Sequence, residues 1–153
     1  MKTIGLIACS STKQSGTHRA ADLYTSHLFR LSRAWVEHHC PDGWYILSAK
    51  HHLLHPDAQV VSYDQALRDL PAAQRALWNR AVAQQLETLM PCRFIVLAGE
   101  LYRQALTGLT YDTPLKGLGI GRQLQWLKSN TDTLAIAGTT CSLNTEPTTQ
   151  RAI

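Results

Sequence analysis

Three short runs of apolar residues alternate with longer stretches in which apolar residues recur at helical spacing. The runs span residues 4–9, 44–48 and 94–98, and polar residues follow each run directly. A continuous apolar run of this length is typical of a strand that is buried on both faces of a parallel sheet. Between the runs, residues 20–38 and the stretch after Pro71 carry large apolar side chains every three or four positions, as one face of a helix does.

This order of strand, helix, strand, helix and strand predicts an α/β fold. Parallel strands that are joined by helices take right-handed crossovers, and the helices cover the faces of the sheet. We therefore expect a small Rossmann-like three-layer sandwich with a mostly parallel sheet of three to four strands.

The part of the chain after the third run predicts shorter elements. They are helices at residues 100–106 and 121–128, a loop at 108–114 and an edge strand at 134–137. From residue 139 onward Thr, Asn, Pro and Gln dominate and apolar residues are scarce, which is typical of a flexible terminus. We expect a single α/β domain over residues 1–138 and a flexible tail over 139–153.

Composition adds the expectation of one core and a weak preference for anionic partners. A chain of 153 residues with 44% hydrophobic residues is long enough for a single core. Lys and Arg total 15 against 11 Asp and Glu, which gives a net charge of +4, but these residues are spread from Lys2 to Arg151. Charge alone is equally compatible with a basic protein that binds no nucleic acid.

The cysteines and the first residues argue against several classes of protein. Cys9, Cys40, Cys92 and Cys141 form no C-x-x-C pair and have no histidine at zinc-finger spacing, so we expect no metal and no other cofactor. The apolar run at the start is too short for a signal peptide, and no run reaches about 18 apolar residues. We expect a cytoplasmic protein with reduced thiols and no membrane segment.

Polar residues gather where each predicted strand ends. Residues 9–13 follow the first strand, 48–52 the second and 99–102 the third. In an open parallel sheet the ligand crevice lies at the carboxyl ends of the strands, near a change in strand order. Each group alone is equally well explained as a surface loop, but the three together predict one cavity for a phosphorylated or nucleotide-like ligand.

Two loops are candidates for binding a phosphate or another anion. The first offers hydroxyls, backbone N–H groups and an ammonium, from Ser10, Ser11, Thr12 and Lys13. The second has alternate glycines before a helix and consists of Lys116, Gly117, Gly119, Gly121 and Arg122. Neither is a P-loop or a dinucleotide fingerprint, because the glycine spacing differs. The second loop is also explained as a helix entry whose glycines serve packing only.

Two carboxylates are candidates for catalysis. Asp64 follows Tyr63 after the second strand, and Glu100 stands where the helix after the third strand begins. A carboxylate in such a crevice positions a water molecule or stabilises positive charge that develops on a sugar. The alternative is that Asp64 is a turn or N-cap acceptor and Glu100 a first-turn charge.

Four polar residues near the end of the second strand are candidates for contacting a nucleobase: Ser48, Lys50, His51 and Tyr63. Reading His51-His52-x-x-His55 as a metal cluster is disfavoured, because no carboxylate follows at a recognised metal-site spacing. Cys9 is better explained as packing at the end of a buried strand than as a nucleophile.

Six segments, in this order along the chain, carry a resemblance to known proteins. They are Ile7-Ala8-Cys9-Ser10-Ser11-Thr12-Lys13, Asp22-Leu23-Tyr24-Thr25-Ser26-x-Leu28-Phe29, Trp44-Tyr45-Ile46-Leu47-Ser48-Ala49-Lys50-His51-x-Leu53-Leu54-x-Pro56-Asp57, Tyr63-Asp64, Ala98-Gly99-x-x-Tyr102 and Pro114-Leu115-x-Gly117-Leu118-Gly119-Ile120-Gly121. Over about residues 4–128 the chain resembles a largely uncharacterised bacterial and phage domain family. Residues 48–63 also resemble a segment of the YaaA peroxide-stress family and, more distantly, the uracil-DNA-glycosylase-like domains attached to tRNA-guanine transglycosylases. Where those relatives usually carry glycine, this chain has His52.

The resemblance implies that the chain handles nucleic acid or nucleobases, by analogy of fold. The leading hypothesis is an N-glycosidase that acts on a modified nucleobase in a nucleic acid or a nucleotide. Such a reaction passes through a cationic sugar and needs no metal. The alternative is a non-catalytic DNA- or nucleotide-binding accessory protein of stress response or phage defence. An NAD-dependent oxidoreductase is disfavoured because the glycine fingerprint is missing.

Overall fold

The computed structural model describes residues 1–138, and only the backbone of residues 131–138. The chain divides into two compact units, Met1–Gly117 and the part from Leu118 onward. The first unit contains a five-stranded sheet in the order β4-β3-β1-β6-β7. Its strands are β1 (Lys2–Ala8), β3 (Trp44–Ser48), β4 (His52–Leu54), β6 (Cys92–Leu97) and β7 (Tyr111–Asp112). The predicted α/β class is confirmed.

The sheet is mostly parallel, with β1 in its centre. β1 pairs in parallel with β3, where Ile7 lies opposite Ile46, and with β6, where Ile4 lies opposite Phe94. β7 continues the parallel part beside β6, and only β4 runs antiparallel, beside β3. The expectation of three to four strands was therefore too low. β4 and β7 have three and two residues, too few to show a pattern of alternation in the sequence.

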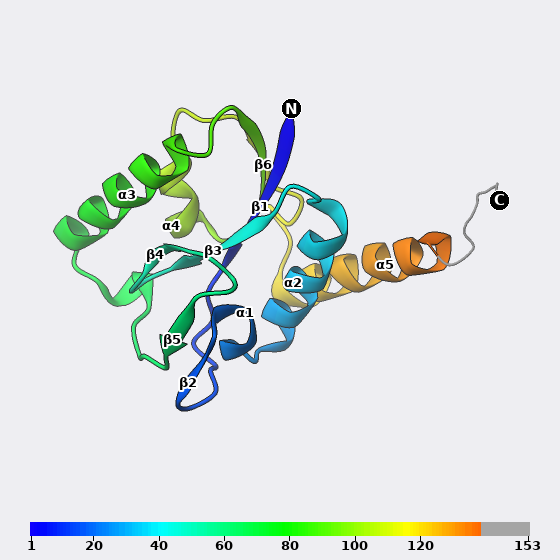
Figure 1. The fold of residues 1–153 in the computed structure, drawn as a ribbon, viewed down its shortest axis with the longest axis horizontal. Helices are drawn as coiled ribbons and strands as arrows, with labels where there is room; N and C mark the ends of the chain where they lie inside the picture. Colours follow the sequence, from blue (N-terminus) through cyan, green and yellow to red (C-terminus); the bar gives the residue numbers. More distant parts are fainter. Residues whose placement is uncertain (139–153) are drawn as a thin grey trace. The chain divides into compact units, whose positions relative to one another are not determined.

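Helices cover both faces of this sheet. Ile4 and Leu6 of β1 belong to a core cluster with Trp78 of α3 (Ala72–Glu87). Successive residues of a strand face opposite sides of a sheet, so Gly5, between Ile4 and Leu6, faces the other side. On that side lies α2 (His27–His39). A Cβ atom on Gly5 would lie 2.8 Å from Val36 Cγ1, so α2 needs glycine at this position. Figure 1 shows α2 and α3 on opposite sides of the strands.

The single helix expected over residues 20–38 is two helices, α1 (Ala20–Leu23) and α2. Tyr24 between them is extended, with φ −89° and ψ 127°, and forms a bridge with Lys13. Ser26 then caps α2, its hydroxyl oxygen accepting a hydrogen bond from the Phe29 N–H at 3.1 Å. The apolar residues keep their helical spacing across the break between α1 and α2, so this spacing did not predict the break.

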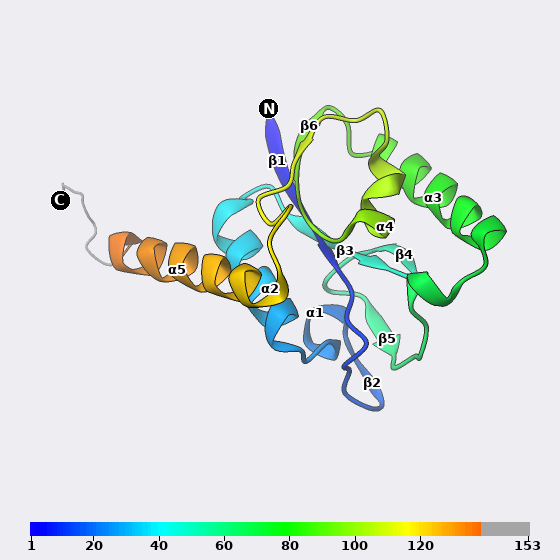
Figure 2. The same ribbon diagram turned by 180° about the vertical axis from the view of Figure 1, so that it is seen from behind.

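A small antiparallel pair lies beyond the carboxyl ends of the parallel strands. It consists of β2 (Thr17–Arg19) and β5 (Gln59–Val61). Both views of the ribbon show β2, β5 and α1 together at this end of the first unit (Figures 1 and 2). Three short helical segments complete the unit: η1 (Leu67–Asp69), α4 (Glu100–Arg103) and η2 (Gln104–Leu106).

The second unit contains α5 (Ile120–Gly138). The edge strand expected at residues 134–137 is wrong, because these residues belong to α5. No glycine or proline stands between residues 122 and 137, so nothing in the sequence ends the helix early. The flexible tail expected over residues 139–153 lies outside the described residues. Among the helices within residues 1–138, none combines the length and the apolar content that crossing a bilayer requires.

Candidate functional site

The strand order places a crevice at the carboxyl ends of β1 and β6. From β1 the chain passes to β3 on one side, and from β6 it passes to β7 on the other. Such a reversal between neighbouring parallel strands is where open α/β sheets bind ligands. Cys9 follows β1 here, and α4 after β6 carries Tyr102, whose Oη lies 3.4 Å from Cys9 Sγ. The two strand ends are thus joined by a polar contact.

A chain of three buried hydroxyl groups lies at the same edge. Tyr24 Oη and Tyr63 Oη are 2.6 Å apart, and Tyr63 Oη and Ser48 Oγ are 2.8 Å apart. Ser48 ends β3, and its Oγ also accepts a hydrogen bond from the His51 N–H at 3.0 Å. The exposed fractions of Tyr24, Ser48 and Tyr63 are only 2%, 0% and 9%. Segments distant in sequence therefore meet in one hydrogen-bonded group.

Burial keeps these phenols neutral. Loss of solvent raises the pKa of Tyr24 to about 12, and it also raises the pKa of Tyr63, with Cys9 adding to the effect. The pKa of Tyr102 is raised for the same two reasons. The group therefore offers neutral hydroxyls rather than phenolates at physiological pH.

Two lysines bring positive charge to Tyr63. Lys13 Nζ lies 4.4 Å from the centre of the Tyr63 ring and 5.8 Å from that of Tyr24, and Lys50 Nζ lies 5.9 Å from that of Tyr63. These distances are within the range of cation–π contacts. In the described part of the chain, neither lysine has a carboxylate within salt-bridge distance. Two uncompensated charges beside one ring favour the approach of an anion.

His51 and His52 differ in their roles. The His51 ring meets the Tyr63 ring edge-on at 5.2 Å, and its Nε2 is buried without a hydrogen-bond partner among residues 1–138. Burial, with Lys50 and His52 nearby, lowers the pKa of His51, so this imidazole is neutral at pH 7. His52 has a φ of 62°, in the left-handed region that glycine adopts freely. The turn therefore has a glycine-like conformation although its residue is histidine.

The first predicted phosphate loop is held mainly by its backbone. Ser10 Oγ accepts the Thr12 N–H at 3.2 Å, and the Thr12 carbonyl accepts the Thr25 N–H at 3.0 Å. Ser11 and Thr12 are exposed, whereas Lys13 is half-buried. The bridge between Lys13 and Tyr24 places this loop directly beside the hydroxyl chain.

The second predicted phosphate loop is divided between the two units. Lys116 and Gly117 end the first unit, and Gly117 has a φ of 82°, which glycine accommodates without strain. Gly119, Gly121 and Arg122 belong to the second unit and are exposed. Only Lys116 and Gly117 of this loop therefore belong to the same unit as Lys13 and Lys50.

The two predicted catalytic carboxylates are exposed at the same strand ends. Asp64 follows the buried Tyr63, and Glu100 is the first residue of α4, two positions before Tyr102. Within residues 1–138, neither carboxylate takes part in a hydrogen bond or ion pair between side chains. Both are accessible to a ligand, but no neighbour fixes their orientation.

A comparison with protein-family models assigns the chain to a family. Residues 4–129 match the model of DUF6884, a family of unknown function. The chain belongs to this family. No curated protein and no solved structure matches it. The DUF6884 match takes in every residue of the hydroxyl chain and both lysines beside it.

Sequence reasoning missed the part that Tyr24 plays in this DUF6884 site. Its position fits the apolar face of a helix, and nothing local marks its hydroxyl as the partner of Tyr63, 39 residues away. Tyr102 stood in a predicted polar strand end, but without a role, and Cys9 was assigned to packing. A signal was present, since tyrosines buried in a core usually need a hydrogen-bond partner.

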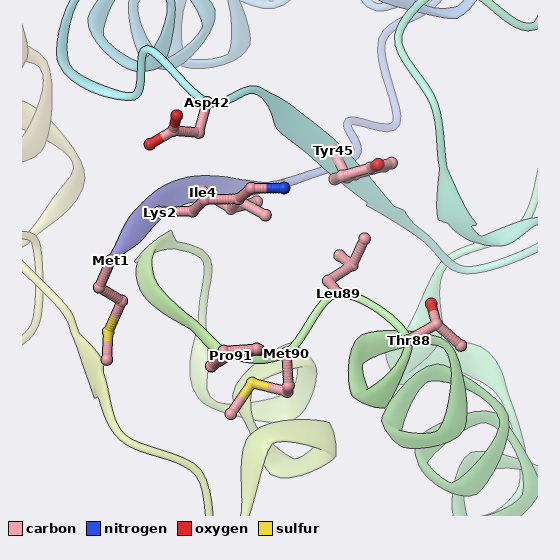
Figure 3. Close-up of a pocket in the computed structure, with 9 residues that line it drawn as sticks. All are labelled: Met1, Lys2, Ile4, Asp42, Tyr45, Thr88, Leu89, Met90 and Pro91. Carbon is pink, nitrogen blue, oxygen red and sulfur yellow. The ribbon is translucent and has the colours of Figure 1, made fainter.

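Another hollow of the first unit lies at the opposite edge of the sheet. It has a volume of about 720 Å³, and its lining in Figure 3 includes Lys2, Asp42 and Met90. These residues stand at or before the starts of β1, β3 and β6. The Asp42 carboxylate accepts the Thr3 N–H at 2.8 Å. In this DUF6884 chain the hollow is therefore separate from the carboxyl ends, where α/β sheets place their ligands.

Proposed function

We propose that the chain binds a nucleotide or nucleic acid at the carboxyl edge of its sheet and acts on it as an N-glycosidase that removes a modified base. The observation that carries the proposal is the pair of uncompensated lysines, Lys13 and Lys50, beside the buried ring of Tyr63. Two ammonium groups that no carboxylate of residues 1–138 neutralises suit a ligand that carries a phosphate group.

The fold supports the same proposal. Parallel strands with helices on both faces and a reversal of strand order at β1 and β6 are the arrangement of Rossmann-like three-layer sandwiches. We assign the chain to that architecture as part of the proposal. The sequence resemblance to the YaaA family and to uracil-DNA-glycosylase-like domains favours nucleobase chemistry, by analogy of fold.

Each residue of the site has a proposed role. Lys13 and the hydroxyls and amides of residues 10–12 bind phosphate, and Lys50 adds a second positive charge near the Tyr63 ring. Asp64 or Glu100 stabilises the cationic sugar or positions the attacking water.

A cytoplasmic location belongs to this proposal. Nucleic acids and nucleotides are abundant there, and free thiols persist because the compartment is reducing. Cys9, Cys40 and Cys92 are all unpaired, which fits such a setting.

The experiment measures base release and binding separately. Wild type, Asp64→Asn and Glu100→Gln are incubated with modified DNA, tRNA and nucleotides, and free base is quantified. Each substitution preserves shape and removes negative charge, so the responsible one should lower turnover by about 10²-fold or more while binding and melting temperature stay unchanged. Turnover that is the same in both variants as in wild type contradicts the assigned roles.

A second candidate function is a non-catalytic module that binds DNA or nucleotides. The observation that favours it is the exposure of Asp64 and Glu100 without partners that would orient them. A wild-type protein that binds nucleotide or nucleic acid and releases no base from any substrate would establish this second function.

A further inference from the structure

A second pocket of the first unit lies between the turn after β3 and the first half of α3. Its volume is about 320 Å³. Six residues define its chemistry: Lys50, His52, Gln65, Gln74, Leu77 and Trp78. The pocket adjoins the lysine pair at Tyr63 because Lys50 belongs to both, with its Nζ 5.9 Å from the centre of the Tyr63 ring.

The backbone at His52 directs its side chain to this pocket at a conformational cost. With a φ of 62°, His52 occupies a region that glycine enters freely and that side chains rarely adopt. Its neighbours hold it there: His52 pairs with Ser48 across the sheet, and the Leu53 N–H donates to Gln85 Oε1 of α3 at 3.0 Å. Non-glycine residues kept in such conformations concentrate at ligand sites.

The wall of the pocket is apolar. Leu77, which is 59% exposed, lines it together with Leu70. Trp78 also lines it but is almost wholly buried, at 2% exposed, and its indole N–H donates to the Ser48 carbonyl at 2.8 Å. A flat ligand placed here would cover Leu77.

The rim of the pocket carries polar groups of both kinds, donor and acceptor. The Gln65 amide N–H₂ donates to the Ala49 carbonyl at 3.3 Å, which orients the side chain and leaves its oxygen as an acceptor. Within residues 1–138, the side chains of His52 and Gln74 make no hydrogen bond. An apolar wall with a few convergent amide and imidazole groups is how proteins hold heterocyclic rings.

We propose that this pocket binds the nucleobase of the ligand whose phosphate lies at Lys13 and Lys50, and that His52, Gln65 and Gln74 select the base through its edge. The proposal rests on the proposed function and adds the place and the residues of base selection. It assigns Lys50 a position between phosphate and base.

The test compares ligands with and without a base. Dissociation constants are measured calorimetrically for ribose 5-phosphate and for the four common nucleoside 5′-monophosphates. Wild type should bind at least one nucleotide about tenfold more tightly than ribose 5-phosphate. His52→Gly and Gln74→Ala should each reduce that preference several-fold, up to about tenfold, the effect of one lost hydrogen bond. Neither should change the affinity for ribose 5-phosphate.

Two controls separate base selection from a structural role. Gln84→Ala removes a second exposed glutamine of α3 that is outside the pocket, and it should leave every affinity unchanged. His52→Gly replaces a strained residue with the one that fits a φ of 62°, so its melting temperature should equal or exceed that of wild type. Weaker nucleotide binding by a more stable protein is a result that a purely structural role of His52 does not produce.

Two results would overturn the inference, and they differ in what they leave standing. If wild type binds nucleotides no more tightly than ribose 5-phosphate, or if both variants keep the wild-type preference, the pocket does not select a base, while the phosphate site stands. If wild type binds neither ribose 5-phosphate nor any nucleotide, the phosphate site fails and the base pocket fails with it.

Discussion

Replacing Tyr63 with phenylalanine removes the central hydroxyl of the buried chain and nothing else. The ring remains, so the contacts of Lys13 and His51 with it remain as well. The substitution breaks the hydrogen bonds of 2.6 Å to Tyr24 and 2.8 Å to Ser48 at once. Because the environment is buried, both partners lose a hydrogen bond that no water molecule readily replaces.

The magnitude follows from those two bonds. A typical hydrogen bond contributes about 1 kcal/mol net, and a buried polar group left without a partner costs about 1–3 kcal/mol. We expect the free energy of unfolding to fall by about 2–4 kcal/mol, a large part of the roughly 5–15 kcal/mol of an ordinary domain. Equilibrium urea unfolding measures the difference, and an unchanged slope would show that the unfolded states are comparable.

The matched control is Tyr45→Phe. Tyr45 is half-buried, and its hydroxyl makes no hydrogen bond within the described residues, so this variant should stay within about 0.5 kcal/mol of wild type. If Tyr63→Phe is as stable as Tyr45→Phe, the hydroxyl chain does not hold the carboxyl edge together and the reasoning is refuted.

Two further predictions concern packing and pH. Gly5→Ala should lower the free energy of unfolding by about 1–3 kcal/mol, because its Cβ would lie 2.8 Å from Val36 Cγ1, and wild-type stability in urea would contradict the packing of α2 on β1. Burial lowers the pKa of His51 in the folded chain below the ordinary value of 6.5. As the pH falls below 6.5, His51 of the unfolded chain therefore binds a proton first, and the free energy of unfolding decreases until the pH reaches the lowered pKa of the folded chain. Melting temperatures from pH 8 to pH 4 should fall less steeply for His51→Gln than for wild type or the exposed-site control His27→Gln, and three parallel profiles would disprove this assignment.

The sequence was sufficient for the central strands and for α3. The strands β1, β3 and β6 lie within two residues of their predicted ends, because strands buried on both faces are continuous apolar runs. α3 was predicted from the spacing of Trp78, Val82 and Leu86, which are all buried in the structure. In both cases the signal is local and repeats over several residues.

The parts of the fold that the sequence did not predict depend on contacts between distant parts of the chain. β2 and β5 are three residues each and exist only as partners of one another. The helix break at Tyr24 serves a hydroxyl contact with Tyr63, and helical spacing carries no trace of it. The left-handed conformation of His52 was indicated only by the resemblance, in which the relatives usually carry glycine at this position.

Most of the candidate site was predicted as a location rather than as a mechanism. Polar residues at three strand ends indicated the carboxyl edge, and Lys13, Lys50 and Tyr63 do lie together there. Their mutual geometry follows from the pairing of β1 with β3 and from the path of the chain through β5. The catalytic roles of Asp64 and Glu100 stay predictions.

The central claim is that Lys13 and Lys50 bind the phosphate of a nucleotide at the carboxyl edge, and calorimetric titration with nucleoside 5′-monophosphates tests it most directly. The variants are Lys13→Ala, Lys50→Ala and, as the control, Lys2→Ala at the opposite edge of the sheet. A lost hydrogen bond to a charged group costs about 1.5–3 kcal/mol, so each of the first two variants should bind about 10- to 100-fold more weakly and with a flatter salt dependence, while Lys2→Ala binds as wild type does. Wild-type affinity in both Lys13→Ala and Lys50→Ala, or a loss of binding in Lys2→Ala alone, would contradict the claim.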